Sequence, residues 1–162
     1  RQILPELLSD SRIQVILTDA RLWLRTAGRR YDVVIVDMPD PSTSQLNRFY
    51  TREFFASVHA ALQSGGVLGF SLGEYEDYVG PDLGRMLATA RATLAAVFDS
   101  VLVLPGARVR FLASDGPLTA DVAGRLEALG IPTRVMNRHY LRGDRRRSDW
   151  PACAAPRRSR PR

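Results

Sequence analysis

YDVVIVDMPDPST, residues 31–43, is the stretch that decides how this chain folds. Its β-branched run from Val33 to Val36 is typical of a strand that is covered on both faces of a parallel sheet. Asp37 stands where this strand ends, and in open α/β sheets the ligand crevice lies outside the carboxyl ends of the strands. We therefore expect the loop at residues 37–43 to carry the chemistry of this protein.

Two carboxylates, those of Asp37 and Asp40, lie on this loop. Pro39 and Pro41 restrict its backbone to few conformations. A pair of acids on a stiff loop suits a positively charged ligand. The competing interpretation is that Asp and Pro simply make a good turn after a strand, and the pattern by itself leaves both open.

Segments typical of strands and helices alternate along the rest of the chain. We predict strands at residues 13–17, 31–37, 67–72, 100–104 and 109–113, and helices at 20–27, 50–62, 82–98 and 119–129. Such alternation favours an α/β fold with a mostly parallel sheet and helices on both sides. The last two strands are joined by a short turn and should form an antiparallel hairpin.

Composition predicts one globular domain and a tail. A chain of 162 residues with 45% hydrophobic residues can bury a core. From Arg142 onward, eight Arg against two Asp account for the whole net charge of +6, so the rest is balanced. We assign residues 1–141 to the domain and 142–162 to a disordered Arg- and Pro-rich tail. For that tail, an unstructured end is favoured over contact with nucleic acid or an anionic membrane.

Several classes of protein are disfavoured. The single cysteine, Cys153, excludes an internal disulfide and a cysteine-based metal site, and two histidines argue against zinc, so no metal is expected. No apolar run approaches the roughly 20 residues that cross a bilayer, and the first residues lack a signal-peptide pattern. We expect a cytoplasmic protein without a membrane segment in this chain, although a longer parent could be membrane-attached.

The acidic loop and the segments around it resemble a known family. DMPDP at residues 37–41 is followed by LNRFYTREFF at 46–55, and Asp19-Ala20 and GGV at 65–67 match in order and spacing. In these residues the chain is similar to the aminopropyltransferases, the spermidine synthases and their bacterial relatives. The resemblance covers about residues 1–141. Its specific part is the acidic loop and the helix start, since the remainder fits many methyltransferase-like folds.

The resemblance implies a Rossmann-like fold of the S-adenosylmethionine-dependent methyltransferase type. The glycine-rich nucleotide loop of the family and its ribose-binding acid would precede residue 1. The chain therefore resembles the C-terminal part of a catalytic domain whose N-terminal half is missing. Two departures are that Ala20 replaces a common glycine and Leu104 stands where a tyrosine is often found.

The resemblance also implies an activity. It is the transfer of an aminopropyl group from decarboxylated S-adenosylmethionine, a co-substrate and not a permanently bound cofactor, to putrescine or a similar polyamine. By their match to the family, Asp37 is the candidate base and Asp40 would hold the ammonium of the acceptor, with Tyr50 as a second substrate contact. Asp19 would bind the adenine amino group, and Ala20 would offer its backbone N–H beside it.

The implied partners are a small polyamine and the nucleoside co-substrate, with no specific nucleic acid, and a homo-oligomer is left open. Structural roles compete for two of these residues, since Asp19 can cap the helix at 20–27 and Tyr50 can be a buried anchor. Three other functions stay open: a methyltransferase-like enzyme with a different acceptor, a non-catalytic remnant of the fold, and nucleic-acid binding through the tail.

Overall fold

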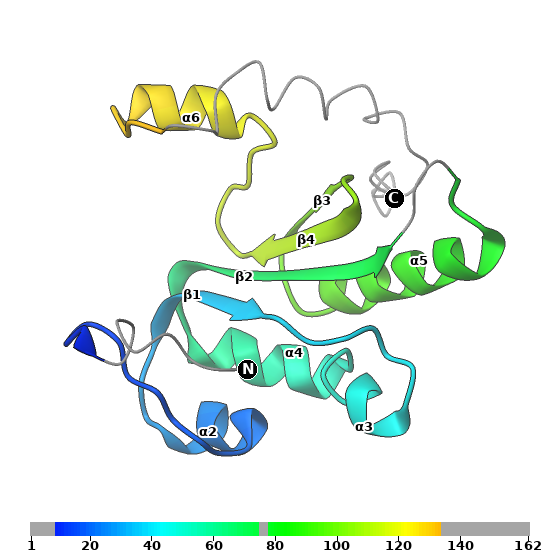
Figure 1. The fold of residues 1–162 in the computed structure, drawn as a ribbon, viewed down its shortest axis with the longest axis horizontal. Coiled ribbons are helices and arrows are strands. Elements are labelled where there is room, and N and C mark those ends of the chain that lie inside the picture. Colours follow the sequence, from blue (N-terminus) through cyan, green and yellow to red (C-terminus); the bar gives the residue numbers. More distant parts are fainter. Residues whose placement is uncertain (1–8, 75–77, 134–162) are drawn as a thin grey trace, which may run out of the picture.

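The run from Val33 to Val36 lies in the first strand of a four-stranded sheet (Figure 1). The computed structural model describes residues 9–74 and 78–133. Along the chain its elements are α2 (Ala20–Thr26), β1 (Tyr31–Val36), α3 (Ser44–Asn47), α4 (Arg52–Ala61), β2 (Leu62–Glu74), α5 (Pro81–Ala95), β3 (Ser100–Leu104), β4 (Arg108–Ser114) and α6 (Val122–Ala128).

The strand order in the sheet is β1-β2-β4-β3. β1 and β2 are parallel, whereas β4 is antiparallel to both β2 and β3. Three strands therefore run in one direction and β4 runs against them, which confirms the predicted α/β class and the closing antiparallel hairpin. Because Glu74 pairs with Arg108, β4 begins at the edge of the sheet where β1 and β2 end.

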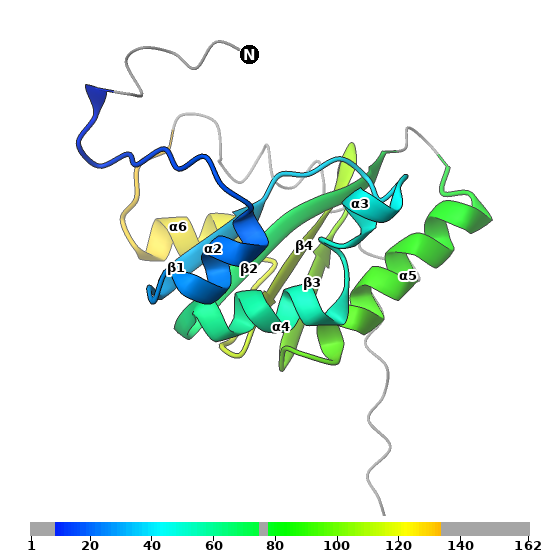
Figure 2. The ribbon, with the colours of Figure 1, turned by 90° about the horizontal axis from the view of Figure 1, so that it is seen from below.

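Three helices pack together on one side of this sheet. Figure 2 shows α2, α4 and α5 in front of the strands, while α6 lies on the other side. Thr51 caps the start of α4, since its hydroxyl accepts a hydrogen bond from the backbone N–H of Phe54 and so satisfies one of the free donors of the first turn. The buried side chains of α4 follow the helical period and face the sheet: Phe54, Phe55, Val58 and Ala61.

Stacked aromatic rings join α4 to the sheet. Phe70 of β2 lies against Phe111 of β4, with ring centroids 5.0 Å apart and planes within 6°. Phe70 also stacks on Phe55 of α4, at 5.7 Å and 19°. Phe55 and Phe111 are almost completely buried, so these rings form the centre of the hydrophobic core.

Two predictions about strands are wrong. Residues 13–17 form no strand, and Leu17 is 93% exposed, because none of the described strands lies beside this segment to share hydrogen bonds with it. β1 is not covered on both faces either. It is an edge strand, and Val33 and Ile35 are 56% and 75% exposed on the face opposite to α2, α4 and α5.

The last helix begins later than predicted. α6 starts at Val122, where Asp121 accepts a hydrogen bond from the N–H of Gly124, while the Thr119 hydroxyl accepts the N–H of Asp121.

The segment assigned to the tail, residues 142–162, lies outside the described residues. Among the helices of residues 9–74 and 78–133, none combines the length and apolarity that a membrane span requires.

Candidate functional site

The candidate site lies where the carboxyl ends of β1 and β2 meet the beginning of β4. Asp37 directly follows β1 and its side chain is exposed. In the described part of the chain, the Asp37 carboxylate makes no hydrogen bond or ion pair with another side chain. It is thus an unengaged acid at the sheet edge where α/β proteins bind ligands.

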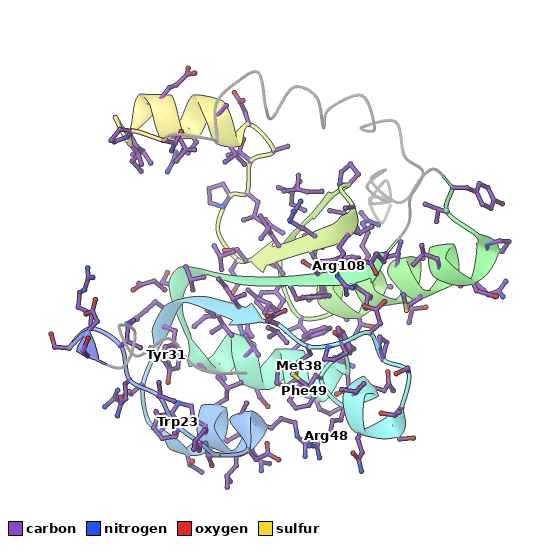
Figure 3. The ribbon with its side chains drawn as sticks, viewed as in Figure 1. Trp23, Tyr31, Met38, Arg48, Phe49 and Arg108 are labelled. Atoms are coloured by element: carbon purple, nitrogen blue, oxygen red, sulfur yellow. The ribbon has the colours of Figure 1, made fainter. Side chains whose placement is uncertain are left out.

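Asp40 differs from Asp37 because its carboxylate already has partners. The Arg108 guanidinium donates to Asp40 Oδ1 at 2.5 Å, and the backbone N–H of Gly73 donates to the same oxygen at 3.2 Å. The two side chains of this ion pair are 35% and 34% exposed, so water reaches the pair. Figure 3 labels Arg108 at the start of β4, beside the end of β2.

Gly73 has a backbone conformation that fits its role at the end of β2. Its φ of +70° lies in the left-handed region, which glycine adopts without steric cost. A Cβ at this position would also collide with the side chain of Leu83 on α5. Glycine here lets β2 end with its N–H aimed at Asp40.

Tyr50 fixes the backbone between the two acids. Its hydroxyl lies 3.2 Å from the carbonyl oxygen of Met38 and 2.9 Å from that of Pro39, and it can donate to either. The ring is buried against Phe70, with centroids 5.8 Å apart. Burial, and secondarily the charge of Asp40, raise the pKa of the Tyr50 hydroxyl, so it stays protonated and remains a donor. The expected buried anchor is therefore observed, while a contact of Tyr50 with substrate stays a prediction.

Replacing Tyr50 by phenylalanine removes this donor and keeps the ring. We expect the free energy of unfolding to fall by about 1 kcal/mol, the usual net value of one hydrogen bond. Amide hydrogen exchange at Met38 and Asp40 should become faster, because the loop loses its attachment to α4. Tyr78→Phe is the matched control, since Tyr78 is 76% exposed. Unchanged exchange in the Tyr50 variant would show that its hydroxyl does not hold the loop.

Asp19 caps α2, as its competing structural role predicted. Its Oδ1 accepts the backbone N–H of Arg21 at 2.9 Å, and Ala20 is the first residue of the helix. This backbone donor is the main reason why the pKa of Asp19 lies below its usual value. The other oxygen, Oδ2, lies 3.9 Å from the guanidinium of Arg48, which also sits over the ring of Phe49.

The structure therefore brings the predicted residues together in two groups. Asp37, Asp40 and Tyr50 share one loop and its anchor. Asp19 and Ala20 lie at the start of α2 and are connected through Arg48 to the segment that follows the loop. Figure 3 labels Arg48, Phe49 and Met38, which lie in the same region of the molecule. Binding of a nucleoside at Asp19 and Ala20 stays a prediction.

Sequence reasoning missed Arg108 as a member of the site. The predicted hairpin could have placed Arg108 at the correct edge of the sheet, because the second strand of a hairpin starts at the edge where the first strand ends. The hairpin did not indicate that β4 would lie next to β2. This position of β4 places Arg108 beside Asp40.

Two surface cavities lie away from the acidic loop. One, of about 420 Å³, is lined by Arg30, His59, Gly66, Phe98 and Asp115 and sits where β2 begins and β4 ends. There His59 Nε2 lies 2.6 Å from the Asp115 carboxylate, and this hydrogen bond lowers the pKa of Asp115. The other, of about 540 Å³, lies between α2 and α4.

No group of three or more His, Cys, Asp or Glu side chains in residues 9–74 and 78–133 could hold a metal ion.

Sequence comparison relates the first part of the chain to one family. A family model described as "Spermine/spermidine synthase domain" matches residues 1–75. The polyamine aminopropyltransferase of Corynebacterium efficiens is 42% identical over 62 residues, which are 36% of this chain and 12% of that protein. The polyamine aminopropyltransferase of Mycobacterium tuberculosis is 37% identical over 94 residues, which are 56% of this chain and 18% of that protein.

Solved structures show the same fold. A spermidine synthase in complex with the transition state analogue AdoDATO aligns with a TM-score of 0.64 and 21% identity, over 92% of this chain and 50% of that one. Human methyltransferase-like protein 13 in complex with SAH aligns with a TM-score of 0.57 and 22% identity, over 84% of this chain and 67% of that one. Both likenesses confirm the Rossmann-like α/β fold, and the chain spans about half the length of that synthase.

The matched family segment contains the acidic loop, its tyrosine anchor and the Asp19-Ala20 pair. The curated relatives agree with it, so residues 1–75 of this chain are similar to the spermidine synthase and polyamine aminopropyltransferase family, and the solved synthases share the fold.

Proposed function

We propose that this chain belongs to an enzyme that transfers an aminopropyl group from decarboxylated S-adenosylmethionine to putrescine or a similar amine. The observation that carries the proposal is the pair of acids on the anchored loop, with Asp37 unengaged at the carboxyl edge of the sheet. We further propose that the protein is cytoplasmic and that the nucleoside part of the co-substrate lies at Asp19 and Ala20.

The chemistry requires one proton to be removed. An alkyl amine titrates near pH 10, like lysine, so both ends of putrescine are ammonium groups at neutral pH. Asp37 accepts a proton from the reacting ammonium and leaves a nitrogen lone pair. That pair forms a bond to the carbon beside the sulfonium, the carbon–sulfur bond breaks, and its electrons neutralise the sulfur. The products are a longer polyamine, methylthioadenosine and one proton.

The remaining residues orient the reactants. The hydrogen bonds from Tyr50 to the Met38 and Pro39 carbonyls keep the two acids at a fixed separation along the loop. Asp40 binds the ammonium at the far end of the acceptor, and this places the reacting nitrogen over Asp37. Such positioning supplies a large part of the rate acceleration in a displacement between two bound molecules.

The direct test is turnover by the purified protein with both substrates. We expect methylthioadenosine and spermidine to appear in equal amounts by liquid chromatography and mass spectrometry. Asp40→Asn should raise the KM for putrescine about fivefold, because one partly exposed charge pair is worth about 1 kcal/mol, and it should also lower kcat, because the reacting nitrogen is less well positioned. Absence of either product under all conditions would reject aminopropyl transfer.

A methyltransferase-like activity is the second candidate. Two observations favour it, the likeness to human methyltransferase-like protein 13 and the fact that Arg108 already neutralises Asp40. Methyl transfer from S-adenosylmethionine needs no clamp for a diamine, so Asp40→Asn would then be nearly silent. Calorimetric titration with methylthioadenosine and with putrescine separates both enzymes from a non-catalytic remnant, which would give no heat with either ligand.

A further inference from the structure

Arg108 and Asp40 form a charge pair inside the proposed acceptor site. Both described hydrogen bonds to the Asp40 carboxylate, from Arg108 and from Gly73, end on the same oxygen, Oδ1. In the described part of the chain, Oδ2 receives neither of them. A guanidinium is positively charged at every accessible pH. In the protein without ligand, one oxygen of the Asp40 carboxylate is therefore hydrogen-bonded and the negative charge is largely neutralised by Arg108.

The fold fixes Arg108 in this place. It is the first residue of β4 and pairs with Glu74 at the end of β2, so its backbone is held by the sheet. Its side chain and that of Asp40 are each about one-third exposed. Because water reaches this partly exposed pair and screens it, the attraction between the two groups is modest, and another cation can compete for Asp40.

We propose that Arg108 determines acceptor specificity: as a built-in cation on Asp40, it occupies the position that the remote ammonium of a diamine would otherwise take. This proposal rests on the proposed function, because it assigns a role within the same site. A diamine must share or displace Arg108, whereas an amine with an uncharged remote end meets no such competitor. Arg108 therefore lowers the preference of the site for a second positive charge.

The test compares two acceptors of similar length, putrescine and butylamine, in wild type and Arg108→Gln. Both kcat/KM and calorimetric affinity are measured. We expect the putrescine-to-butylamine ratio to rise about fivefold in Arg108→Gln, because an exposed pair is worth up to about one kcal/mol and 1.4 kcal/mol is tenfold. The change should lie mainly in the KM and the affinity for putrescine, which should improve more than those for butylamine.

Two variants serve as controls. Arg108→Lys keeps the cation and should keep the ratio of wild type. Arg110→Gln removes the same charge from an exposed position two residues along β4, which pairs with Ser71 and not with the acidic loop, so it should also leave the ratio unchanged. Thermal unfolding followed by circular dichroism verifies that each variant is folded.

The outcomes separate this inference from the proposed function. A wild type that releases no methylthioadenosine, combined with a fivefold shift of the calorimetric ratio in Arg108→Gln, would reject aminopropyl transfer and retain the role of Arg108. An unchanged ratio in both assays, or no binding of either amine to Arg108→Gln, would overturn that role. An equal loss for both amines would overturn it as well and show that Arg108 merely holds the loop.

Discussion

Replacing Asp37 by asparagine is expected to lower kcat for aminopropyl transfer by about 10²–10⁴-fold, the usual contribution of a general base. The amide has the same shape as the carboxylate and cannot accept the proton of the reacting ammonium. The Tyr50 hydroxyl bonds to backbone carbonyls, and these remain in the variant, so the loop keeps its conformation. The measurement is the initial rate of methylthioadenosine release at saturating concentrations of both substrates.

Asp32→Asn provides the matched control for this variant. Asp32 is likewise an exposed aspartate, and it lies in β1 at the opposite end of the strand from the acidic loop. We expect its kcat to equal that of wild type. The Asp37 variant should recover part of its rate as the pH rises toward 10, since the amine then loses its proton to solvent. A kcat within about twofold of wild type for Asp37→Asn would exclude Asp37 as the base.

The order of the elements could be read from the sequence because local patterns encode it. The period of Phe54, Phe55, Val58 and Ala61 predicted one apolar helix face, and all four side chains are buried in α4. Likewise, the end of the apolar run at Val36 marked the end of β1. The placement of Asp37 at the carboxyl edge follows from these local signals alone.

Contacts between distant segments could not be read in this way. Residues 13–17 have the composition of a strand, but a strand forms only where a neighbour supplies hydrogen bonds, and none of the described strands lies beside them. The Arg108–Asp40 pair depends on β4 lying between β2 and β3. Strand order is a property of the whole sheet, and no local pattern in either segment specifies it.

Asp19 has an observed structural role as a helix cap, and the nucleoside contact predicted for it stays a prediction. Its N-cap role uses Oδ1, whereas Oδ2 faces Arg48 at 3.9 Å, a distance at which an ion pair is weak. The hydrogen bonds of the cap therefore leave Oδ2 available as an acceptor. A sequence pattern of Asp before a helix predicts the cap, but the geometry of the side chain is needed to see that an acceptor remains.

Phe111→Ala is expected to cause the largest loss of stability, about 3–5 kcal/mol in the free energy of unfolding. Phe111 is 1% exposed and stacks on Phe70 with centroids 5.0 Å apart. Its removal leaves a cavity between α4 and the sheet and also loses the aromatic contact, which adds about 0.5–1.5 kcal/mol. Since small domains are stable by only about 5–15 kcal/mol, the variant should unfold at much lower urea concentration.

The neighbouring residue tests whether this loss comes from the core itself. Leu112 follows Phe111 on β4, and its side chain points to the opposite face of the sheet and is only partly buried. Leu112→Ala should therefore cost about 1 kcal/mol, as measured by urea unfolding followed by circular dichroism. Equal losses for the two variants would mean that both faces of β4 are covered in solution, and the ring stack at Phe70 would then not be the centre of the core.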